Sequence, residues 1–426
     1  MKILVIGSGG REHALTWKLA KDSCKPELFC APGNAGTAQI ATNVPIEAED
    51  VQGLLDWAKK NRPDLTVVGP EAPLCAGIVD VFAAEGFKAF GPSKAAARME
   101  GSKVFSKEVL VAGKVPTATS RTFTSSGEAL SYVGTGPLPV VIKAEGLAAG
   151  KGVYICTTLA EANAAITDIL VKKIFGDAGN RMIIEEYLEG EEASIMALVD
   201  GKNVVILASS QDHKRVFNND EGPNTGGMGA YSPAPVITDD MWPVIREQVF
   251  DRTLAELKKR GITYKGTLYA GLMITQAGPK VLEFNCRFGD PETQAVIPRM
   301  QTDLTPALLA CVDGTLKEEL VKWRPSACVC VVMVSGGYPG TYSKGKVIEG
   351  LDEAAKLRDI VVFHAGTKLD NGKVVTSGGR VLGVTAVAED MAKAVKQVYL
   401  AMTKLKFDQA QYRTDIARRA LKRLKT

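Results

Sequence analysis

Three short apolar runs near the start of the chain each end in a glycine-rich turn, and this pattern constrains the fold more than any other feature. The runs and turns are Lys2–Ile6 before Gly7-Ser8-Gly9-Gly10, Leu65–Val68 before Gly69-Pro70-Glu71, and Phe87–Phe90 before Gly91-Pro92-Ser93. A helical stretch, His13–Ala20, follows the first turn. Strands that alternate with helices predict a parallel α/β sheet. Ligands of open α/β sheets bind at the carboxyl ends of the strands, so these turns are candidate binding elements.

The composition predicts a globular protein with several domains. The 426 residues are 46% hydrophobic and 23% charged, and the net charge of +4 comes from 52 basic and 48 acidic side chains. This balance argues against dedicated binding of nucleic acid or membrane, so anionic substrates would need local sites. The sequence contains neither a signal peptide nor an apolar run of about 18 residues, so we expect a cytoplasmic protein without membrane spans.

The cysteines and histidines do not form a metal-binding pattern. Among the eight cysteines no Cys-x-x-Cys pair occurs, and the three histidines, His13, His213 and His364, lie far apart in the chain. A zinc site, a thioredoxin-like motif or a histidine-rich metal site is therefore not expected. We expect buried, reduced thiols instead.

The first turn, from Gly7 to Glu12, lies between a strand and a helix, as a dinucleotide-binding fingerprint does. The third glycine of that fingerprint is missing, because Glu12 stands in its place. Backbone amides at a helix N-terminus favour an anion, so we interpret the turn as a phosphate-binding element. NAD binding and a tight turn without a ligand are the two alternatives.

A second glycine-rich segment, Gly146-Leu-Ala-Ala-Gly150-Lys151-Gly152, differs from a P-loop in three ways. Three residues instead of four separate its first two glycines, Gly152 replaces the Ser or Thr that would hold magnesium, and strand-like runs flank it on both sides. We therefore expect a hairpin tip that folds its amides over phosphates, as kinase loops do. Lys143 on the preceding strand is placed to reach a phosphate, and an ordinary surface charge is the alternative.

The segment from Val281 to Arg287 predicts a strand with one polar and one apolar face, because side chains alternate along a strand. The two predicted faces are Glu283, Asn285 and Arg287 on one side and Leu282, Phe284 and Cys286 on the other. Glu283 and Asn285 supply the hard oxygen ligands that magnesium prefers. Arg287 can pair with phosphate or carboxylate. The alternative is a half-exposed strand whose polar side chains only face water.

Two further segments are polar and follow apolar strands. Met182–Glu192 is either a solvated edge or the site where backbone groups near Glu186–Leu188 read an adenine base. Gln211–Arg215 carries charges of both signs and precedes a glycine-rich stretch, Pro223–Ser232, which together suit a small zwitterion and a phosphate. His213 in this segment is either a general base or a structural residue.

Together these motifs resemble the ATP-grasp superfamily, whose members hold ATP between two α+β units, and within it the phosphoribosylamine–glycine ligase family. In chain order, the resemblance rests on Gly7–His13, Pro32–Thr37, Lys143–Gly152, Gln211–Arg215, Asn224–Pro233, Asn285–Glu292 and Thr376–Arg380. It implies an α/β protein with an N-terminal parallel α/β domain at 1–97, a central ATP-grasp domain at 98–122 and 190–325, a lid at 123–189, and a small β-rich C-terminal domain at 326–426.

The resemblance also implies four sets of site residues. The ATP-binding set is Lys103, Lys143, Gly146, Gly150, Lys151, Gly152, Glu185, Glu186, Leu188 and Glu192, with Glu185, Glu186 and Leu188 at the adenine edge and Glu192 at the ribose. The substrate-binding set is Gly9, Gly10, Gly33, Asn34, Pro70, Glu71, Asp212, Lys214, Gly226, Gly227, Gly229, Arg287 and Asp290. The metal ligands are Glu283 and Asn285, and the catalytic residues are Arg287, Lys143 and Asp212.

The implied activity is the ATP-dependent ligation of glycine to 5-phosphoribosylamine in de novo purine biosynthesis. Glycyl phosphate and ADP would form first, and attack by the amine would then give glycinamide ribonucleotide and phosphate. ATP and Mg²⁺ or Mn²⁺ would be the cofactors. The partners would be small molecules, without nucleic acid or membrane, and the chain a monomer or weak homodimer. The alternatives are another ATP-grasp carboxylate–amine ligase, a purine or biotin-type carboxylase that uses bicarbonate, and an NAD oxidoreductase.

Overall fold

The computed structural model describes residues 1–147 and 152–424. The N-terminal part of the chain forms a five-stranded sheet. The strand order is β3-β2-β1-β4-β5, and all neighbours are parallel. The strands are β1 (Lys2–Gly7), β2 (Glu27–Pro32), β3 (Thr42–Asn43), β4 (Leu65–Val68) and β5 (Ala89–Phe90). The accompanying helices are α1 (Gly10–Leu19), α2 (Val51–Asn61), α3 (Glu71–Ala76) and α4 (Ile78–Ala84). The predicted parallel α/β sheet is confirmed.

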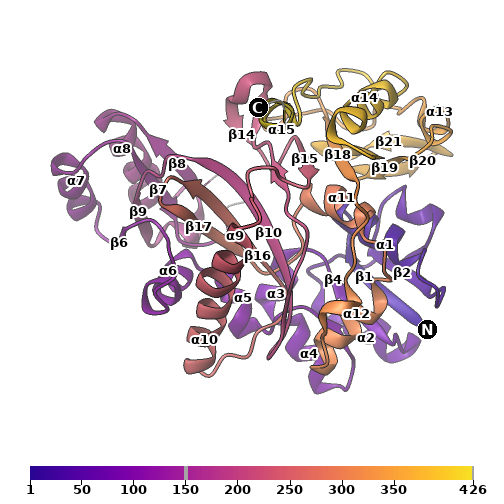
Figure 1. Ribbon diagram of the computed structural model, residues 1–426, viewed down its shortest axis with the longest axis horizontal. Helices are drawn as coiled ribbons and strands as arrows, with labels where there is room; N and C mark the ends of the chain where they lie inside the picture. The colour runs from indigo at the N-terminus through magenta and orange to yellow at the C-terminus, as the bar shows by residue number, and fades with distance from the viewer. Residues whose placement is uncertain (148–151, 425–426) are drawn as a thin grey trace.

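A four-stranded antiparallel sheet forms the centre of the molecule (Figure 1). Its order is β11-β10-β16-β17, with β10 (Glu191–Asp200), β11 (Val204–Ile206), β16 (Lys265–Thr275) and β17 (Gly278–Asn285). Helices α5 (Lys94–Gly101), α6 (Lys103–Ala112), α9 (Met241–Val244) and α10 (Arg252–Lys259) accompany it. The sequence predicts one helix over 95–112, but the chain breaks at Ser102, whose extended backbone and side chain cap α6.

The predicted lid is a separate small unit at the far side of the central sheet (Figure 1). Its antiparallel sheet has the order β6-β9-β7-β8, with β6 (Ser120–Phe123), β7 (Val140–Ala144), β8 (Val153–Cys156) and β9 (Met182–Glu186). Helices α7 (Ser126–Thr135) and α8 (Leu159–Ile166) pack on it through a core of its own that includes Phe123, Ile142 and Ile184. The glycine-rich segment joins β7 to β8, as the hairpin interpretation requires.

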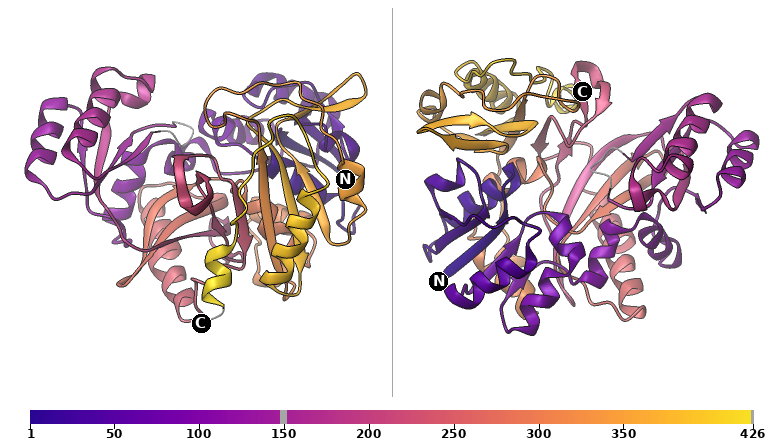
Figure 2. Two further views of the ribbon diagram at one scale, coloured as in Figure 1. Left: turned by 90° about the horizontal axis from the view of Figure 1, so that it is seen from above. Right: turned by 180° about the vertical axis from the view of Figure 1, so that it is seen from behind.

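The C-terminal sheet lies beside the N-terminal sheet, as Figure 2 shows from behind. Its order is β12-β15-β18-β22-β19, with β12 (Gln211–Asp212), β15 (Gly229–Ser232), β18 (Ala327–Val334), β19 (Ile360–His364) and β22 (Arg380–Ala388). Two of these strands precede the predicted boundary at 325/326, so the Gln211–Ser232 segment extends the C-terminal sheet toward the centre of the molecule.

The remaining elements connect these units or pack on them. They are β13 (Arg215–Phe217), β14 (Glu221–Asn224), α11 (Glu292–Val296), α12 (Thr305–Asp313), α13 (Leu351–Ala355), β20 (Thr367–Asp370), β21 (Lys373–Thr376), α14 (Met391–Met402) and α15 (Arg418–Arg423). Within the described ranges, none of the helices has the length and apolar character needed to cross a bilayer.

Candidate active site

A cleft of about 1000 Å³ opens where the four units meet, and most of the predicted site residues line it. Those in the lining are Pro70, Glu71, Lys103, Lys143, Gly152, Glu185, Glu186, Leu188, Glu192, Asp212, Lys214, Gly226, Glu283, Asn285, Arg287 and Asp290. The cleft lining does not include Gly9, Gly10, Gly33, Asn34, Gly146, Gly227 or Gly229. Gly150 and Lys151 lie outside the described residues.

A buried carboxylate holds two lysines at the lid side of the cleft. Glu185 on β9 lies with its Oε2 2.8 Å from the Nζ of Lys143 on β7 and its Oε1 3.0 Å from the Nζ of Lys107 on α6. All three side chains are buried. The Glu185 side chain, predicted at the adenine edge, is thus engaged with the two lysines.

The two lysines differ in how many of their donors are used, and an ammonium group has three. The Nζ of Lys107 contacts Glu185, the Thr117 hydroxyl at 2.8 Å and the Ala118 carbonyl at 3.3 Å, so its donors are saturated. The Nζ of Lys143 contacts only Glu185 and, at 3.1 Å, the Leu282 carbonyl among the described residues. Lys143 therefore retains one donor for a ligand.

Lys103 and Glu145 connect helix α6 to the end of β7. The Nζ of Lys103 donates to the Gly146 carbonyl at 2.9 Å. Glu145 accepts the Val104 N–H at 3.2 Å and the Ser102 hydroxyl, so its carboxylate sits at the N-terminus of α6, where negative charge is stabilised. Burial lowers the pKa of Lys103, while Glu283 opposes that shift. The start of the glycine-rich segment is thereby tied to the central unit.

Strand β17 presents its carboxylate to the cleft through a β-bulge. Glu283 pairs with Gly271 whereas Val281 pairs with Leu272, so Leu282 is the extra residue. Val281 and Phe284 are buried in the core, although Phe284 also borders the cleft, whereas Leu282 and Glu283 are only partly buried and line the cleft. The prediction that Leu282 shares the core face with Phe284 is therefore wrong, because the bulge shifts the alternation by one position. Glu283, Asn285 and Arg287 do lie together in the cleft, as predicted.

Arg287 is held by two carboxylates from the N-terminal half of the chain. Its guanidinium lies 2.9 Å from Glu100 and 3.3 Å from Glu71, and it also donates to Asn285 Oδ1 at 3.3 Å. Burial opposes ionisation, but Glu100 and Glu71 outweigh it and raise the pKa of Arg287. The guanidinium is thus a fixed, permanently charged group in the cleft.

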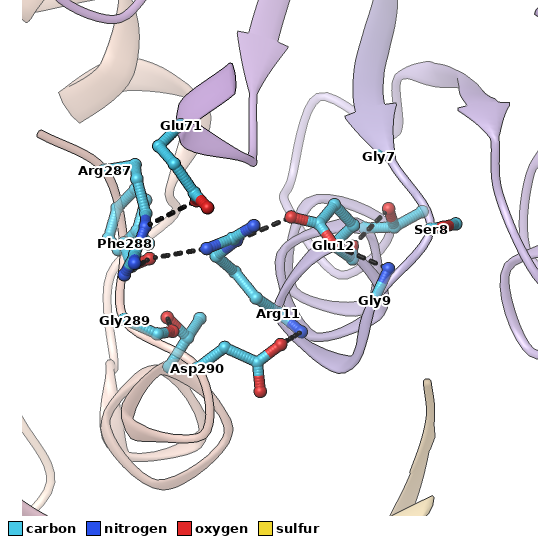
Figure 3. A network of polar contacts seen from close by, with 12 residues as sticks. Gly7, Ser8, Gly9, Arg11, Glu12, Glu71, Arg287, Phe288, Gly289 and Asp290 are labelled. Carbon is cyan, nitrogen blue, oxygen red and sulfur yellow. Dashed lines mark hydrogen bonds and ion pairs between the residues drawn. The ribbon is translucent and has the colours of Figure 1, made fainter. Parts of the chain in front are cut away.

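The first glycine-rich turn is occupied by the protein's own carboxylate, as Figure 3 shows. Glu12 Oε2 accepts the Gly9 N–H at 2.6 Å, and Glu12 Oε1 lies 2.5 Å from the Nε of Arg11. A Cβ at position 9 would lie 2.7 Å from Glu12 Oε2, which explains the glycine. The Gly9 amide predicted to bind phosphate is therefore already satisfied. Arg11 instead lines the cleft and donates to the Phe288 carbonyl at 3.2 Å.

Asn34 is used internally at the junction of the N- and C-terminal units. Its amide nitrogen donates to the carbonyls of Ser8 at 2.8 Å and His364 at 2.9 Å. Its Oδ1 accepts the backbone N–H groups of Gly36 at 2.8 Å and Thr37 at 3.0 Å. The side chain is buried, and this geometry gives it a structural role instead of the implied substrate contact.

Asp212 and Lys214 lie opposite Glu283 in the cleft. Burial raises the pKa of Asp212 to about 7; Lys214 opposes this shift, and Glu292 and Glu192 add to it. The Nζ of Lys214 lies 2.7 Å from Glu192 Oε2, so the carboxylate predicted at a ribose is paired with a lysine. This corner of the cleft combines a titratable acid with a cation.

The C-terminal unit contributes side chains that clamp the Gly226 loop. Arg380 on β22 donates to the Gly226 carbonyl and, at 2.8 Å, to the Asp290 carbonyl. The Tyr338 hydroxyl accepts the Gly226 N–H at 3.1 Å. Gly227 has a φ of 112°, and a Cβ there would lie 2.3 Å from Pro291 Cδ, so this glycine is needed for packing.

Several cleft residues are not indicated as such by the sequence motifs. They are Arg11, Glu100, Lys107, Tyr269, Glu292, Tyr338 and Arg380. Lys107 follows Lys103 by one helical turn, so helix periodicity was a usable signal for it. Arg380 ends a motif that contributed to the resemblance, but nothing local indicated that it reaches the cleft. Glu100 is recognised only through its contact with Arg287, which is distant in sequence.

Comparisons with known proteins agree with this architecture. Three family models match in order: the phosphoribosylglycinamide synthetase N domain over 1–100, the ATP-grasp (A) domain over 101–293 and the C domain over 328–419. The chain is 53% identical to a phosphoribosylamine–glycine ligase from Escherichia coli O157:H7 and 52% identical to one from Pseudomonas aeruginosa, with 99% of each chain covered in both cases.

Solved structures give the same picture. A phosphoribosylamine–glycine ligase from Thermotoga maritima matches with a TM-score of 0.86 and 36% identity, covering 97% of this chain and 100% of that one. A biotin carboxylase from Campylobacter jejuni matches with a TM-score of 0.73 and 15% identity, covering 96% of this chain and 93% of that one. The second likeness shows the fold alone.

Proposed function

This chain belongs to the phosphoribosylglycinamide synthetase family and is an ATP-grasp ligase of purine biosynthesis that joins glycine to phosphoribosylamine, and we propose that its cleft does so in two steps. In the first step the glycine carboxylate attacks the γ-phosphate of ATP, which gives glycyl phosphate and ADP. In the second, the amine of 5-phosphoribosylamine attacks the acyl carbon, which releases phosphate and forms glycinamide ribonucleotide. Phosphorylation is required because a free carboxylate has only oxide as a leaving group.

The lysines on the lid side support ATP binding at that end of the cleft. Lys143 has one donor left, and Lys103 has a single contact among the described residues, at Gly146. We assign both ammonium groups to ATP phosphates, where positioned cations stabilise the charge of a transferring phosphoryl group. Glu186 and Leu188 then lie beside the adenine, and Gly152 lies beside the phosphates.

The donor set on β17 fits a divalent cation. Glu283 stays ionised because Lys214, Lys143 and Lys103 lower its pKa against the effect of burial, and Asn285 adds a neutral oxygen. Within the described ranges, no cluster of three or more His, Cys, Asp or Glu side chains forms a complete protein cage. Such a partial set suits Mg²⁺ or Mn²⁺, which would take further oxygens from ATP and water. When bound, the cation would neutralise phosphate charge.

The residues at the opposite end of the cleft support binding of glycine and phosphoribosylamine there. We assign the carboxylate of glycine to Lys214 and its neighbours at Gly226. We assign the neutral amino group of the incoming phosphoribosylamine to Asp212, whose carboxylate can accept the one proton that the amine loses when it attacks. Arg287 has four donor contacts and five donors, so one remains for the transferring phosphoryl group. Pro70, Glu71 and Asp290, together with Arg11 and Arg380, border the space left for phosphoribosylamine.

The free thiols and the composition of the cleft support the remaining proposals. All eight cysteines are unpaired, which is usual in a reducing compartment, so we place the protein in the cytoplasm. The cleft is built from one chain, so we propose a monomer or weak homodimer as the active form.

Glycine-dependent ADP release with magnesium-ATP, with and without freshly generated phosphoribosylamine, tests the two-step proposal. We expect steady release only when both substrates are present, and hydroxylamine should trap the glycyl phosphate when the amine is left out. Release with bicarbonate in place of glycine would overturn the substrate assignment. Release that needs both substrates but yields no trapped acyl group under any condition would overturn the intermediate.

A further inference from the structure

Side chains alternate in direction along the segment from Asp212 to Lys214, and that of His213, between them, is turned away from the cleft. Asp212 and Lys214 line the cleft, whereas His213 does not. The His213 side chain is buried and packs against Tyr231, with 5.9 Å between ring centroids. Burial lowers the pKa of His213, so the neutral ring has one acceptor nitrogen.

That acceptor nitrogen binds the C-terminal end of the chain. The backbone N–H of Ala417 donates to His213 Nε2 at 3.2 Å. Ala417 has a φ of 66°, a left-handed conformation that residues with a Cβ rarely adopt. The backbone before α15 therefore has an energetically unfavourable conformation at Ala417, the residue whose N–H donates to His213.

A second contact holds Arg215, the residue that follows Lys214 in the chain. Arg413 is 1% exposed, and its Nη1 donates to the Arg215 carbonyl at 3.0 Å. The same guanidinium lies 2.9 Å from Asp220 and 2.8 Å from Asp415. Both sequence neighbours of Lys214 are thus attached to one C-terminal segment, residues 413–419, which we term the C-terminal clamp.

The clamp also grips the β13–β14 hairpin, which lies beside α15 in Figure 1. The Thr414 N–H donates to Asn218 Oδ1 at 2.9 Å, and the Asn218 amide donates back to the Thr414 hydroxyl at 2.8 Å. The Asn219 N–H donates to Asp415 at 2.9 Å. These reciprocal bonds join segments almost two hundred residues apart, so the placement of the hairpin depends on the end of the chain.

We propose that His213 is a positioning residue and that, through it, the C-terminal clamp sets the places of Asp212 and Lys214 in the cleft. The inference rests on the proposed roles of these two residues in binding glycine and accepting the proton of the amine. Lys103, Lys143 and Glu283 make none of these contacts, so loss of the clamp contact acts on the glycine and amine side and leaves ATP binding unchanged.

The test compares His213→Leu, which keeps bulk but removes the acceptor, with His213→Gln, whose amide oxygen can accept the Ala417 N–H. For His213→Leu we expect the KM for glycine to rise about tenfold, the size of one lost buried hydrogen bond, and the KM for ATP to change by less than about twofold. The acidic limb of the pH–rate profile should shift as well, because Asp212 moves. His213→Gln should recover most of the glycine KM.

Two further variants complete the test. Ala417→Gly keeps both the N–H and the left-handed backbone, so it should leave the glycine KM unchanged. An unchanged glycine KM and pH profile in His213→Leu, while Asp212→Asn and Lys214→Met lose the glycine response, would overturn the positioning role and leave the proposed function intact. If Asp212→Asn and Lys214→Met also keep a normal glycine response, the proposed roles of the pair fail, and the inference fails with them.

Discussion

The Nζ of Lys143 lies 2.8 Å from Oε2 of Glu185, and the second oxygen of the same carboxylate holds Lys107, so one buried acid compensates two buried cations. Of these two lysines, Lys143 alone has a donor left for a ligand among the described residues. We therefore expect Lys143→Met to raise the KM for ATP by about tenfold or more and to lower kcat, the effect of losing a charge-assisted hydrogen bond. Initial rates over an ATP titration measure both.

Lys107→Met is the matched control for Lys143→Met, because it removes the other cation from the same carboxylate. It leaves Thr117 and Ala118 without their donor, so the free energy of unfolding should fall by about 1–3 kcal/mol while the KM for ATP stays within about twofold. Urea denaturation measures the free energy of unfolding. A larger rise in the ATP KM for Lys107→Met than for Lys143→Met would contradict the donor assignment.

Glu283→Ala should abolish turnover with little effect on folding. The side chain lines the cleft through the bulge, so we expect kcat to fall by at least about 100-fold and excess magnesium not to restore it. The free energy of unfolding should change by less than about 1 kcal/mol. Glu319→Ala, whose side chain is 67% exposed, is the control and should behave like the unchanged protein. Near-normal turnover of Glu283→Ala at ordinary magnesium would refute the metal assignment.

Structural features that depend on neighbouring residues could be predicted from the sequence. The runs that end in glycine-rich turns became β1, β4 and β5 of a parallel sheet, because each turn lies directly after its strand. The two-residue period brought Glu283, Asn285 and Arg287 into one cleft. The bulge at Leu282 was not readable, because one extra residue in a strand leaves no mark in its composition.

Contacts between segments that are distant in the chain could not be predicted from the sequence either. The partner of the Asn34 amide, His364, is 330 residues away. Gln211 and Asp212 join a sheet whose other members come mostly after residue 326, and a two-residue strand has no periodicity to detect. The Gly9 N–H donates to the carboxylate of Glu12, whereas the motif indicates only that Glu12 replaces a glycine. In each case the tertiary partner, which the local pattern does not contain, decides the role.

The rate of amine attack should depend on the ionisation of Asp212. Burial raises the pKa of this carboxyl to about 7, and only the deprotonated form accepts a proton. We therefore expect kcat/KM for phosphoribosylamine to rise as the pH increases through about 7 and to level off above it. Asp212→Asn should lower the plateau and remove this limb. A pH profile of Asp212→Asn that keeps the same limb would assign the titration to another group.

Asn34→Ala separates the structural role that the geometry gives this residue from the substrate contact that the resemblance implied. The substitution leaves the Ser8 and His364 carbonyls and two backbone N–H groups without their partners, so the free energy of unfolding should fall by about 2–4 kcal/mol, while the KM for phosphoribosylamine stays within about twofold. Gln276→Ala, at the exposed turn between β16 and β17, is the control and should change neither. A higher KM for phosphoribosylamine without loss of stability would instead mean that Asn34 turns toward the substrate, because only a direct contact alters affinity while the junction between the two units stays intact.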